Sequence, residues 1–305
     1  MPHAFNSTGT FMGLPRSSLP CAAKAAIIGL PFDCGTHPYR IGARLGPSAI
    51  REQSLLLRPY DVTSDRDPIG ALGVVDMGDA AVQPGEIESS FAAIEEAIGE
   101  LAEAGIVPVS LGGDGAIALP EMRALHRAHP HLVTVHIDAH TDAYPIEGYN
   151  TATAFARAVE EGLVDAQRSF QIGMHGSVLV KGVMAHGKSL GYNIVTMHEL
   201  LTRGIGEVFA EVRRRIGDRP VYLSFDMDFF DPSVAPGVCT PTFGGASARE
   251  GLAALEGCSG LDLVGVNINT VSPPHDVGGM SALLAGTVAL GSLALIARNH
   301  QAESK

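Results

Sequence analysis

Short apolar runs alternate with longer segments of helical periodicity along the chain. The runs are rich in Val and Ile and mostly lack an alternation of apolar and polar residues, which is typical of strands buried on both faces. Strands are predicted over residues 25–30, 73–77, 107–111, 134–138, 169–172, 193–196, 221–226 and 263–266. Helices are predicted over residues 47–55, 87–104, 119–128, 152–161, 198–203, 205–216, 248–255 and 281–299. This order predicts an α/β fold in which helices cover both faces of a parallel sheet.

The domain organisation follows from the length and from the first twenty residues. With 305 residues, of which 46% are hydrophobic, the chain is long enough for one large core. Residues 1–20 contain prolines and polar residues but no hydrophobic signal core, so we predict a flexible or partner-contacting arm rather than a targeting peptide. Residues 21–305 are then expected to form a single domain.

The net charge and the cysteine content limit which binding partners and which cellular compartment are expected. The formal net charge of −12 argues against nucleic acid and anionic membranes as partners. The sequence has no uninterrupted run of about 18 apolar residues, so no membrane span is predicted. The four cysteines form no CxxC pair, which argues against a zinc ribbon or a disulfide scaffold and favours a reduced, cytoplasmic setting.

Two carboxylates follow the apolar run at residues 221–223. Asp226 and Asp228 are two positions apart, so on a strand their side chains project to the same side. Adjacent carboxylates in an apolar setting repel each other and are costly to desolvate. A divalent cation is the simplest compensation for both effects.

A second polar run follows the predicted strand near residue 137. Asp138, His140 and Asp142 alternate there, and parallel sheets place their sites at the carboxyl ends of the strands. Four carboxylates and one imidazole suit one or two first-row metal ions. His136 is in phase with this run but lies deeper in the strand, so we interpret it as a hydrogen-bonded core histidine.

Several segments resemble, in order, those of the ureohydrolase family, which includes arginases, agmatinases and guanidinobutyrases. They are residues 31–35, 42–51, the Gly-Gly-Asp turn at 112–114, the Asp-x-His-x-Asp run at 138–142, residues 158–163 and 171–173, the Ser-x-Asp-x-Asp-x-x-Asp-Pro run at 224–232, and residues 272–276. The likeness spans nearly the whole chain. It implies a three-layer α/β/α fold with a largely parallel sheet of about eight strands, and assembly as trimers or hexamers.

The resemblance also implies a dinuclear metal centre, usually manganese and sometimes nickel. That centre activates a hydroxide for attack on a guanidinium carbon, and urea leaves. By resemblance, Asp138 and Asp226 bridge the two metals and His140 and Asp228 complete one of the two positions. Asp142 belongs to the other position.

Three departures from the family pattern affect this chemistry. Gly115 stands where the family has a metal-binding histidine, Thr151 replaces a proton-shuttling histidine, and Thr270 replaces a glutamate that pairs with the guanidinium. Loss of an acid–base group alone costs about 10²–10⁴-fold in rate. In addition, Thr242 stands where agmatinases often have a glutamate, and His175 replaces an arginine. The combination predicts impaired catalysis.

The leading hypothesis is therefore a non-catalytic subunit that works with an active paralogue in a hetero-oligomer. This arrangement resembles heteromeric hydrolases of guanidine or of metformin-like biguanides. Its site would hold one or two Mn or Ni ions, or none. The alternative is an active dinuclear amidinohydrolase, homo-oligomeric, in which Thr151 and Thr270 shape a pocket for another guanidino compound. In that case His175 or a water molecule replaces the missing ligand. A metal-free protein that senses a guanidino ligand is a third hypothesis.

Overall fold

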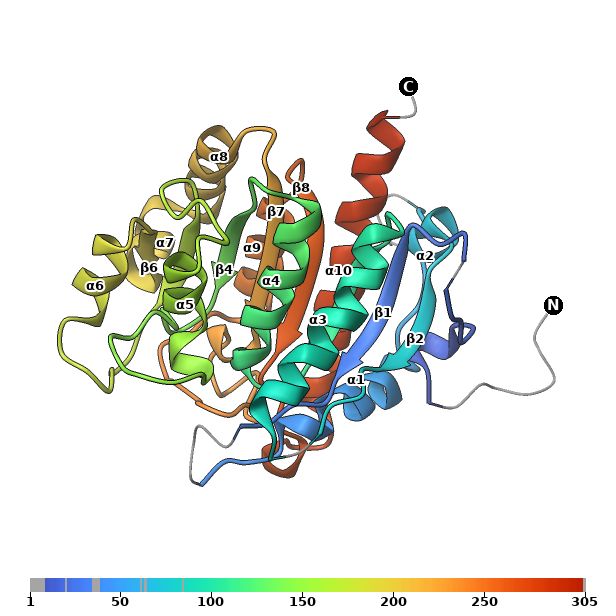
Figure 1. The fold of residues 1–305 in the computed structure, drawn as a ribbon, viewed down its shortest axis with the longest axis horizontal. Helices are drawn as coiled ribbons and strands as arrows, with labels where there is room; N and C mark the ends of the chain where they lie inside the picture. Colours follow the sequence, from blue (N-terminus) through green and yellow to red (C-terminus); the bar gives the residue numbers. More distant parts are fainter. Residues whose placement is uncertain are drawn as a thin grey trace.

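Eight parallel strands form the centre of the fold (Figure 1). The computed structural model describes residues 9–303 apart from residues 20, 35–38, 61, 63, 64 and 84. The strands are β1 (Ala25–Leu30), β2 (Val75–Asp79), β3 (Val107–Gly112), β4 (Val133–Ile137), β5 (Phe170–Met174), β6 (Asn193–Thr196), β7 (Pro220–Asp226) and β8 (Asp262–Asn269). They pair in the order β2-β1-β3-β8-β7-β4-β5-β6. All eight predicted strands are confirmed, because runs of Val and Ile buried on both faces give a strong sequence signal.

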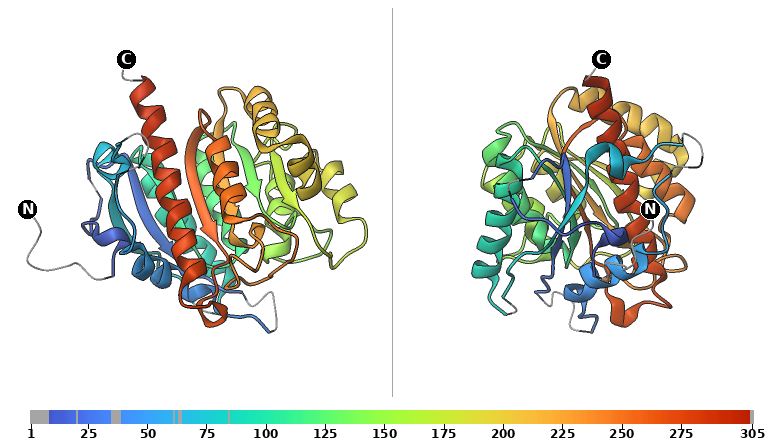
Figure 2. Two further views of the ribbon diagram at one scale, coloured as in Figure 1. Left: turned by 180° about the vertical axis from the view of Figure 1, so that it is seen from behind. Right: turned by 90° about the vertical axis from the view of Figure 1, so that its right-hand side faces the viewer.

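Helices cover both faces of the sheet and complete three layers (Figures 1 and 2). One layer contains α3 (Ile87–Glu103), α4 (Ala118–Ala128) and α5 (Ala154–Glu160). The other contains α1 (Gly46–Ser54), α2 (Pro68–Leu72), α7 (Met197–Arg203), α8 (Ile205–Ile216), α9 (Ala248–Gly257) and α10 (Met280–Glu303). Helix α6 (Val183–Ser189) contacts the edge strand β6. The sequence did not predict α2 and α6. Helix α2 has only five residues, and α6 buries only Val183 and Gly187, so neither shows a periodic apolar pattern.

The segment before β1 belongs to the domain. Phe11 is completely buried, and its backbone N–H donates to Asp76 Oδ2 at 2.8 Å. The buried Arg51 side chain reaches the same carboxylate at 2.9 Å. The prediction of a flexible arm over residues 1–20 is therefore corrected for residues 9–19, while residues 1–8 and 20 lie outside the described residues.

Helix α10 carries the longest apolar stretch of the chain. Residues Met280–His300 are long and apolar enough to cross a membrane by length and composition, but 61% of the most apolar window is buried inside the protein. The helix packs against α1, α2, α9 and β8. A core helix that is apolar on most sides meets the same criteria as a membrane span, so α10 is interpreted as part of the core.

Four adjacent strands position the polar residues singled out above. Strands β3, β8, β7 and β4 occupy the middle of the sheet, and Asp226 in β7 pairs with Asn269 in β8. Because all strands are parallel, their carboxyl ends meet at one edge of the sheet, at the bottom of Figure 1. The loops after β3, β4, β7 and β8 therefore converge there.

Candidate metal and substrate site

Asp226 and Asp228 come together at the end of β7, although only Asp226 is in the strand. The strand ends at Asp226, and a 3₁₀ turn (Met227–Phe229) begins directly after it. Asp226 Oδ1 accepts a hydrogen bond from the backbone N–H of Asp228 at 2.7 Å. The expected strand alternation is therefore replaced by a capped turn, and both carboxylates remain buried, with 2% exposure each.

Asp138 and His140 meet Asp228 across the β4–β7 pair. Strand β4 ends at Ile137, so these residues lie in the following bend rather than on the strand. His140 Nδ1 lies 3.3 Å from Asp138 Oδ1 and 3.1 Å from Asp228 Oδ2. The three side chains place one imidazole nitrogen and two carboxylate oxygens within 4.8 Å of one another. The two predicted polar runs thus form one site.

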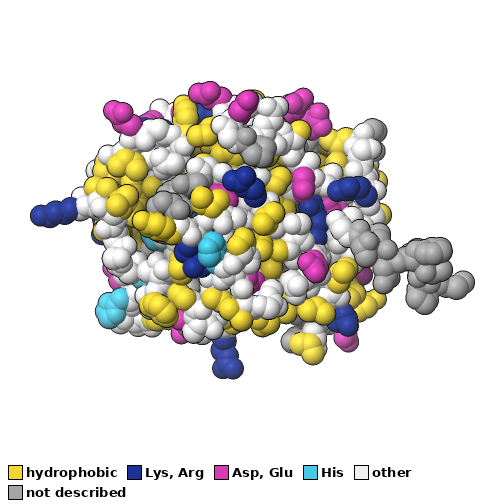
Figure 3. Space-filling model, turned by 90° about the horizontal axis from the view of Figure 1, so that it is seen from below, with side chains coloured by type: hydrophobic (Ala, Val, Ile, Leu, Met, Phe, Trp, Pro, Cys, Tyr) yellow, Lys and Arg dark blue, Asp and Glu magenta, His cyan; other side chains and the backbone are white. Residues whose placement is uncertain are grey.

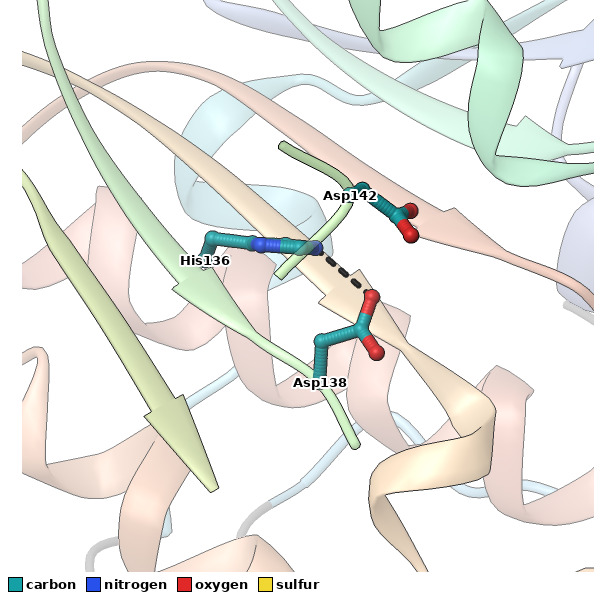
Figure 4. A group of neighbouring side chains, drawn as sticks. All are labelled: His136, Asp138 and Asp142. Carbon is teal, nitrogen blue, oxygen red and sulfur yellow. Dashed lines mark ion pairs between the residues drawn. The ribbon is translucent and has the colours of Figure 1, made fainter. Parts of the chain in front are cut away.

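Asp142 and His136 lie on another side of Asp138 (Figure 4). His136 Nε2 is 2.7 Å from Asp138 Oδ2, and the His136 ring stacks on Phe155 with centroids 3.9 Å apart. Asp142 adopts a positive φ of 45°, which is uncommon outside glycine. The burial predicted for His136 is confirmed. His136 is two positions before Asp138, so the strand periodicity already indicated that both side chains lie on the same side, at the site.

The site concentrates negative charge in a buried setting. Burial, together with the neighbouring carboxylates, raises the pKa values of Asp142, Asp226 and Asp228 above their usual range. Burial also opposes ionisation of Asp138, but the charges of His136 and His140 outweigh it and lower the pKa of that carboxyl. A divalent cation would relieve this repulsion, and imidazole with carboxylate is a suitable donor set for a first-row metal.

Gly115 lies beside this cluster and faces it. It follows Asp114, whose carboxylate accepts from the backbone N–H groups of Ala116 at 3.0 Å and Cys34 at 2.7 Å; Asp114 thus holds the loop. A Cβ built on Gly115 would lie 3.1 Å from Asp142 Oδ2 and 2.8 Å from Thr151 Cγ2. Position 115 therefore points into the site but provides no donor atom.

Thr270 is placed directly against the carboxylate of Asp226. The Thr270 hydroxyl donates to Asp226 Oδ1, while its backbone N–H donates to the Gly113 carbonyl at 2.7 Å. Its φ is +66°, an uncommon value for a β-branched residue. The Thr270 side chain is thus occupied by a carboxylate of the site itself.

Cys239 is a site residue that sequence reasoning did not single out. Its backbone N–H donates to the Thr270 carbonyl at 3.1 Å, and its side chain is nearly buried. Burial, and then the charges of Asp114 and Asp226, raise the pKa of the thiol. The sequence could have indicated Cys239, because it lies in the same segment as Thr242, which the family pattern had already singled out.

His175 and Thr242 contact each other at the side of the site. His175 Nδ1 lies 2.7 Å from the Gly173 carbonyl and Nε2 lies 3.2 Å from the Thr242 carbonyl. Both ring nitrogens thus face backbone oxygens. His175 belongs to neither metal-binding group found among the described residues.

Comparison with known proteins places this arrangement in a family. The Arginase family profile matches residues 23–294. This chain belongs to the arginase family. It is 40% identical over 299 residues to a guanidinopropionase from Pseudomonas aeruginosa, covering 97% of this chain and 93% of that protein. It is 37% identical over 290 residues to a guanidinobutyrase from the same organism, covering 93% and 91% of the two chains.

Solved structures of the arginase family confirm the fold. The proclavaminate amidino hydrolase from Streptomyces clavuligerus superposes with a TM-score of 0.92 at 34% identity and covers 96% of this chain and 98% of its own. A hypothetical agmatinase from Burkholderia thailandensis gives a TM-score of 0.89 at 30% identity, with 96% and 92% coverage. The three-layer α/β/α architecture predicted from the sequence is therefore confirmed. Its Asp and His groups are arranged so that they could bind divalent metal.

Proposed function

We propose that this arginase-family chain is a subunit of a complex that hydrolyses a C–N bond of a guanidino compound, and that its own site is catalytically impaired. The observation that carries the proposal is the lack of an imidazole at positions 115 and 151, which are so close that a Cβ built on Gly115 would lie 2.8 Å from Thr151 Cγ2. The resemblance places a metal-binding histidine and a proton-shuttling histidine at these two positions. Here they carry a hydrogen atom and a threonine, packed against each other beside Asp142.

The remaining donors support binding of a divalent cation. Asp138, His140, Asp226 and Asp228 would hold it, with Mn²⁺ or Ni²⁺ as the proposed ions. A bound divalent cation in such a site polarises a substrate and lowers the pKa of water. These four residues supply the negative charge and the donor atoms that would hold the cation. They can do so without the side chains that are missing at positions 115, 151 and 270.

The residues around the donors do not supply the rest of the chemistry. The Thr151 hydroxyl does not ionise near neutral pH, so it does not replace the acid–base assistance of a histidine, which is worth about 10²–10⁴-fold. Thr270 is neutral and donates its hydrogen bond to Asp226, so it provides no charge-assisted bidentate contact to a guanidinium. One loss affects proton transfer and the other affects binding of the guanidinium. Together they make turnover by this chain alone very slow.

The rim of the site supports a subunit role. The loops after β1, β5, β7 and β8 expose Tyr39, Leu179, Phe243 and Val277, with exposures of 84%, 83%, 78% and 67%. Figure 3 shows apolar side chains spread over the face at which the strands end. Contiguous exposed apolar patches mark protein–protein contacts, and we propose that these side chains together form such a contact at the rim. The proposed partner is a paralogue with both histidines intact, in a trimer or hexamer.

The substrate class and the compartment complete the proposal. Relatives named guanidinopropionase and guanidinobutyrase support a guanidino acid as the substrate of the complex. A biguanide is the second proposed substrate, and it rests on the resemblance to heteromeric hydrolases alone. Within the described part of the chain, no disulfide joins any of Cys21, Cys34, Cys239 and Cys258, which supports a reducing, cytoplasmic setting.

The second candidate function is an active amidinohydrolase with altered specificity. The names of its relatives favour it, as does the group formed by His136, Asp138 and Asp142, which gives a second cation an alternative imidazole. In that case Thr151 and Thr270 would shape the pocket for a different guanidino compound.

Hydrolysis by the purified chain, followed as urea release or, for a biguanide, also as release of ammonia or an amine, separates the two candidates. The chain is reconstituted with Mn²⁺ or Ni²⁺, its metal content is measured by elemental analysis, and it is assayed with guanidinopropionate, guanidinobutyrate, agmatine and a biguanide. The proposal predicts bound metal without detectable turnover. Turnover at ordinary enzyme rates of about 1–10³ s⁻¹ would overturn it in favour of the active enzyme.

A further inference from the structure

His136, Asp138 and Asp142 form a second group of potential metal ligands beside Gly115. One donor atom from each lies within 4.8 Å of the others, and none of the three residues is more than 4% exposed. Figure 4 shows the His136 ring and the Asp138 carboxylate meeting tip to tip, with the Asp142 carboxylate beside them. All three come from the end of β4 and the bend that follows it.

The contact between His136 and Asp138 has the length of a hydrogen bond but not its geometry. Nε2 and Oδ2 are 2.7 Å apart, yet within the described part of the chain Asp138 Oδ2 accepts no hydrogen bond of acceptable geometry. Two ligands separated by about 80–90° on a six-coordinate cation, with bonds of about 2.1 Å, lie roughly 2.7–3.0 Å apart. The observed distance is therefore compatible with two donors that share one cation.

The imidazole of His136 is also held in place from the side. Its ring stacks on Phe155 with an interplanar angle of 20°, which fixes the plane of the ring and the direction of Nε2. Asp142 Oδ2 is the atom that a side chain at position 115 would meet first after Thr151. His136 and position 115 thus both approach the carboxylate of Asp142, His136 from β4 and position 115 from the loop after β3.

We propose that His136, Asp138 and Asp142 bind a divalent first-row cation, with His136 supplying the imidazole that Gly115 does not. The ion shares Asp138 with the cation held by His140 and Asp228. It neutralises Asp142 and joins the end of β4 to its following bend. The inference rests on the metal-binding part of the proposed function, and it holds whether or not the chain turns over a substrate.

Metal stoichiometry of wild-type protein is the first arm of the test. Metal-free full-length chain is titrated with Mn²⁺ and, separately, Ni²⁺ by calorimetry, and elemental analysis counts the ions retained. The inference predicts two cations per chain, and bound Mn²⁺ should show the exchange-coupled electron paramagnetic resonance spectrum of a pair of ions sharing a carboxylate. A single cation per chain at saturating metal would overturn the inference without any variant.

Substitutions then identify the ligand. His136→Gln is expected to remove one cation and to leave the other, with an affinity loss beyond the 10–100-fold typical of losing a residue that only orients a ligand. His140→Gln is expected to remove the other cation instead. His126→Gln is the matched control, because His126 Nδ1 lies 2.7 Å from the Leu163 backbone carbonyl and His126 belongs to neither ligand group among the described residues. This variant should keep both ions.

A spectroscopic readout separates ligation from positioning. Pulsed electron paramagnetic resonance of a Mn²⁺-loaded sample should detect one more imidazole nitrogen in wild-type protein than in His136→Gln. Equal nitrogen coupling and equal stoichiometry in the two proteins would contradict the inference. None of these readouts uses activity, so absence of turnover, as the proposed function expects, does not affect the outcome.

Discussion

A side chain at position 115 and the methyl group of Thr151 compete for the same space. The Cβ of any residue other than glycine at position 115 would lie 2.8 Å from Thr151 Cγ2. Thr151 is β-branched and has few alternative rotamers, so the methyl cannot easily move aside. The two departures from the family pattern at Gly115 and Thr151 are therefore structurally coupled rather than independent.

A double-mutant cycle tests this coupling. Gly115→Ala alone should lower the free energy of unfolding by about 1–3 kcal/mol, the usual cost of overpacking a core. In the Thr151→Ser background, which removes only Cγ2, the same change should cost at least about 1 kcal/mol less. Chemical denaturation of the four proteins gives the coupling energy. Gly206→Ala is the control, because nothing lies within 4 Å of a Cβ at that helical position. Additive effects of Gly115→Ala and Thr151→Ser on the free energy of unfolding would contradict the steric account.

The Thr270 hydroxyl is expected to stabilise the metal-free site. Thr270→Val keeps the shape of the side chain but removes the donor to Asp226, so it should cost about 1–3 kcal/mol of unfolding free energy in the presence of a chelator. Thr270→Ser keeps the donor and is the matched control. Urea denaturation with and without the chelator makes the comparison. If the Val variant is as stable as the Ser variant, the hydrogen bond contributes nothing.

The sheet was predictable from sequence, and so were the elements that carry the site. Strands such as β4, in which every residue is buried, have an apolar run that no surface helix shows. The bends after β4 and β7 were not predictable, because the strand periodicity of Asp226 and Asp228 is also compatible with the capped turn that forms there. The contact of Thr270 with Asp226 and the position of Gly115 beside Asp142 were not predictable from the sequence either. Both depend on how β8 and the loop after β3 meet in space.

Phe11 tests the correction to the N-terminal segment. Its side chain is fully buried, although the surrounding sequence is rich in polar residues and proline and gave no strand or helix signal. Phe11→Ala should lower the free energy of unfolding by about 3–5 kcal/mol. Leu56→Ala, at a position that is 62% exposed, should change it by less than about 0.5 kcal/mol. Similar stabilities of the two variants would show that residues 9–19 do not contribute to the core.

Glu121 should make stability depend on pH. It is fully buried and receives hydrogen bonds from Ser110, Tyr222 and Asn267. Burial raises the pKa of this carboxyl to about 7 despite those hydrogen bonds. The folded state therefore holds this proton where the unfolded state has lost it, and the contribution of Glu121 to stability falls as pH rises from about 4.5 to about 7.

Glu121→Gln removes that dependence. Relative to wild type, the variant should gain up to about 3 kcal/mol in unfolding free energy between pH 4.5 and pH 7.5. Guanidinium denaturation at the two pH values measures the difference, and Glu103→Gln, on the exposed end of α3, is the control for loss of a surface charge. A difference that stays constant with pH would show that Glu121 ionises normally.

We propose that this chain supports turnover by a partner rather than performing it. The most direct test titrates the purified, metal-loaded chain into a purified arginase-family paralogue that has both histidines, and follows urea release from a guanidino substrate. The account predicts no detectable urea from this chain alone and a rate that rises and then saturates at a fixed ratio of the two chains. Urea release by this chain alone at about 1–10³ s⁻¹, unchanged by the paralogue, would contradict it.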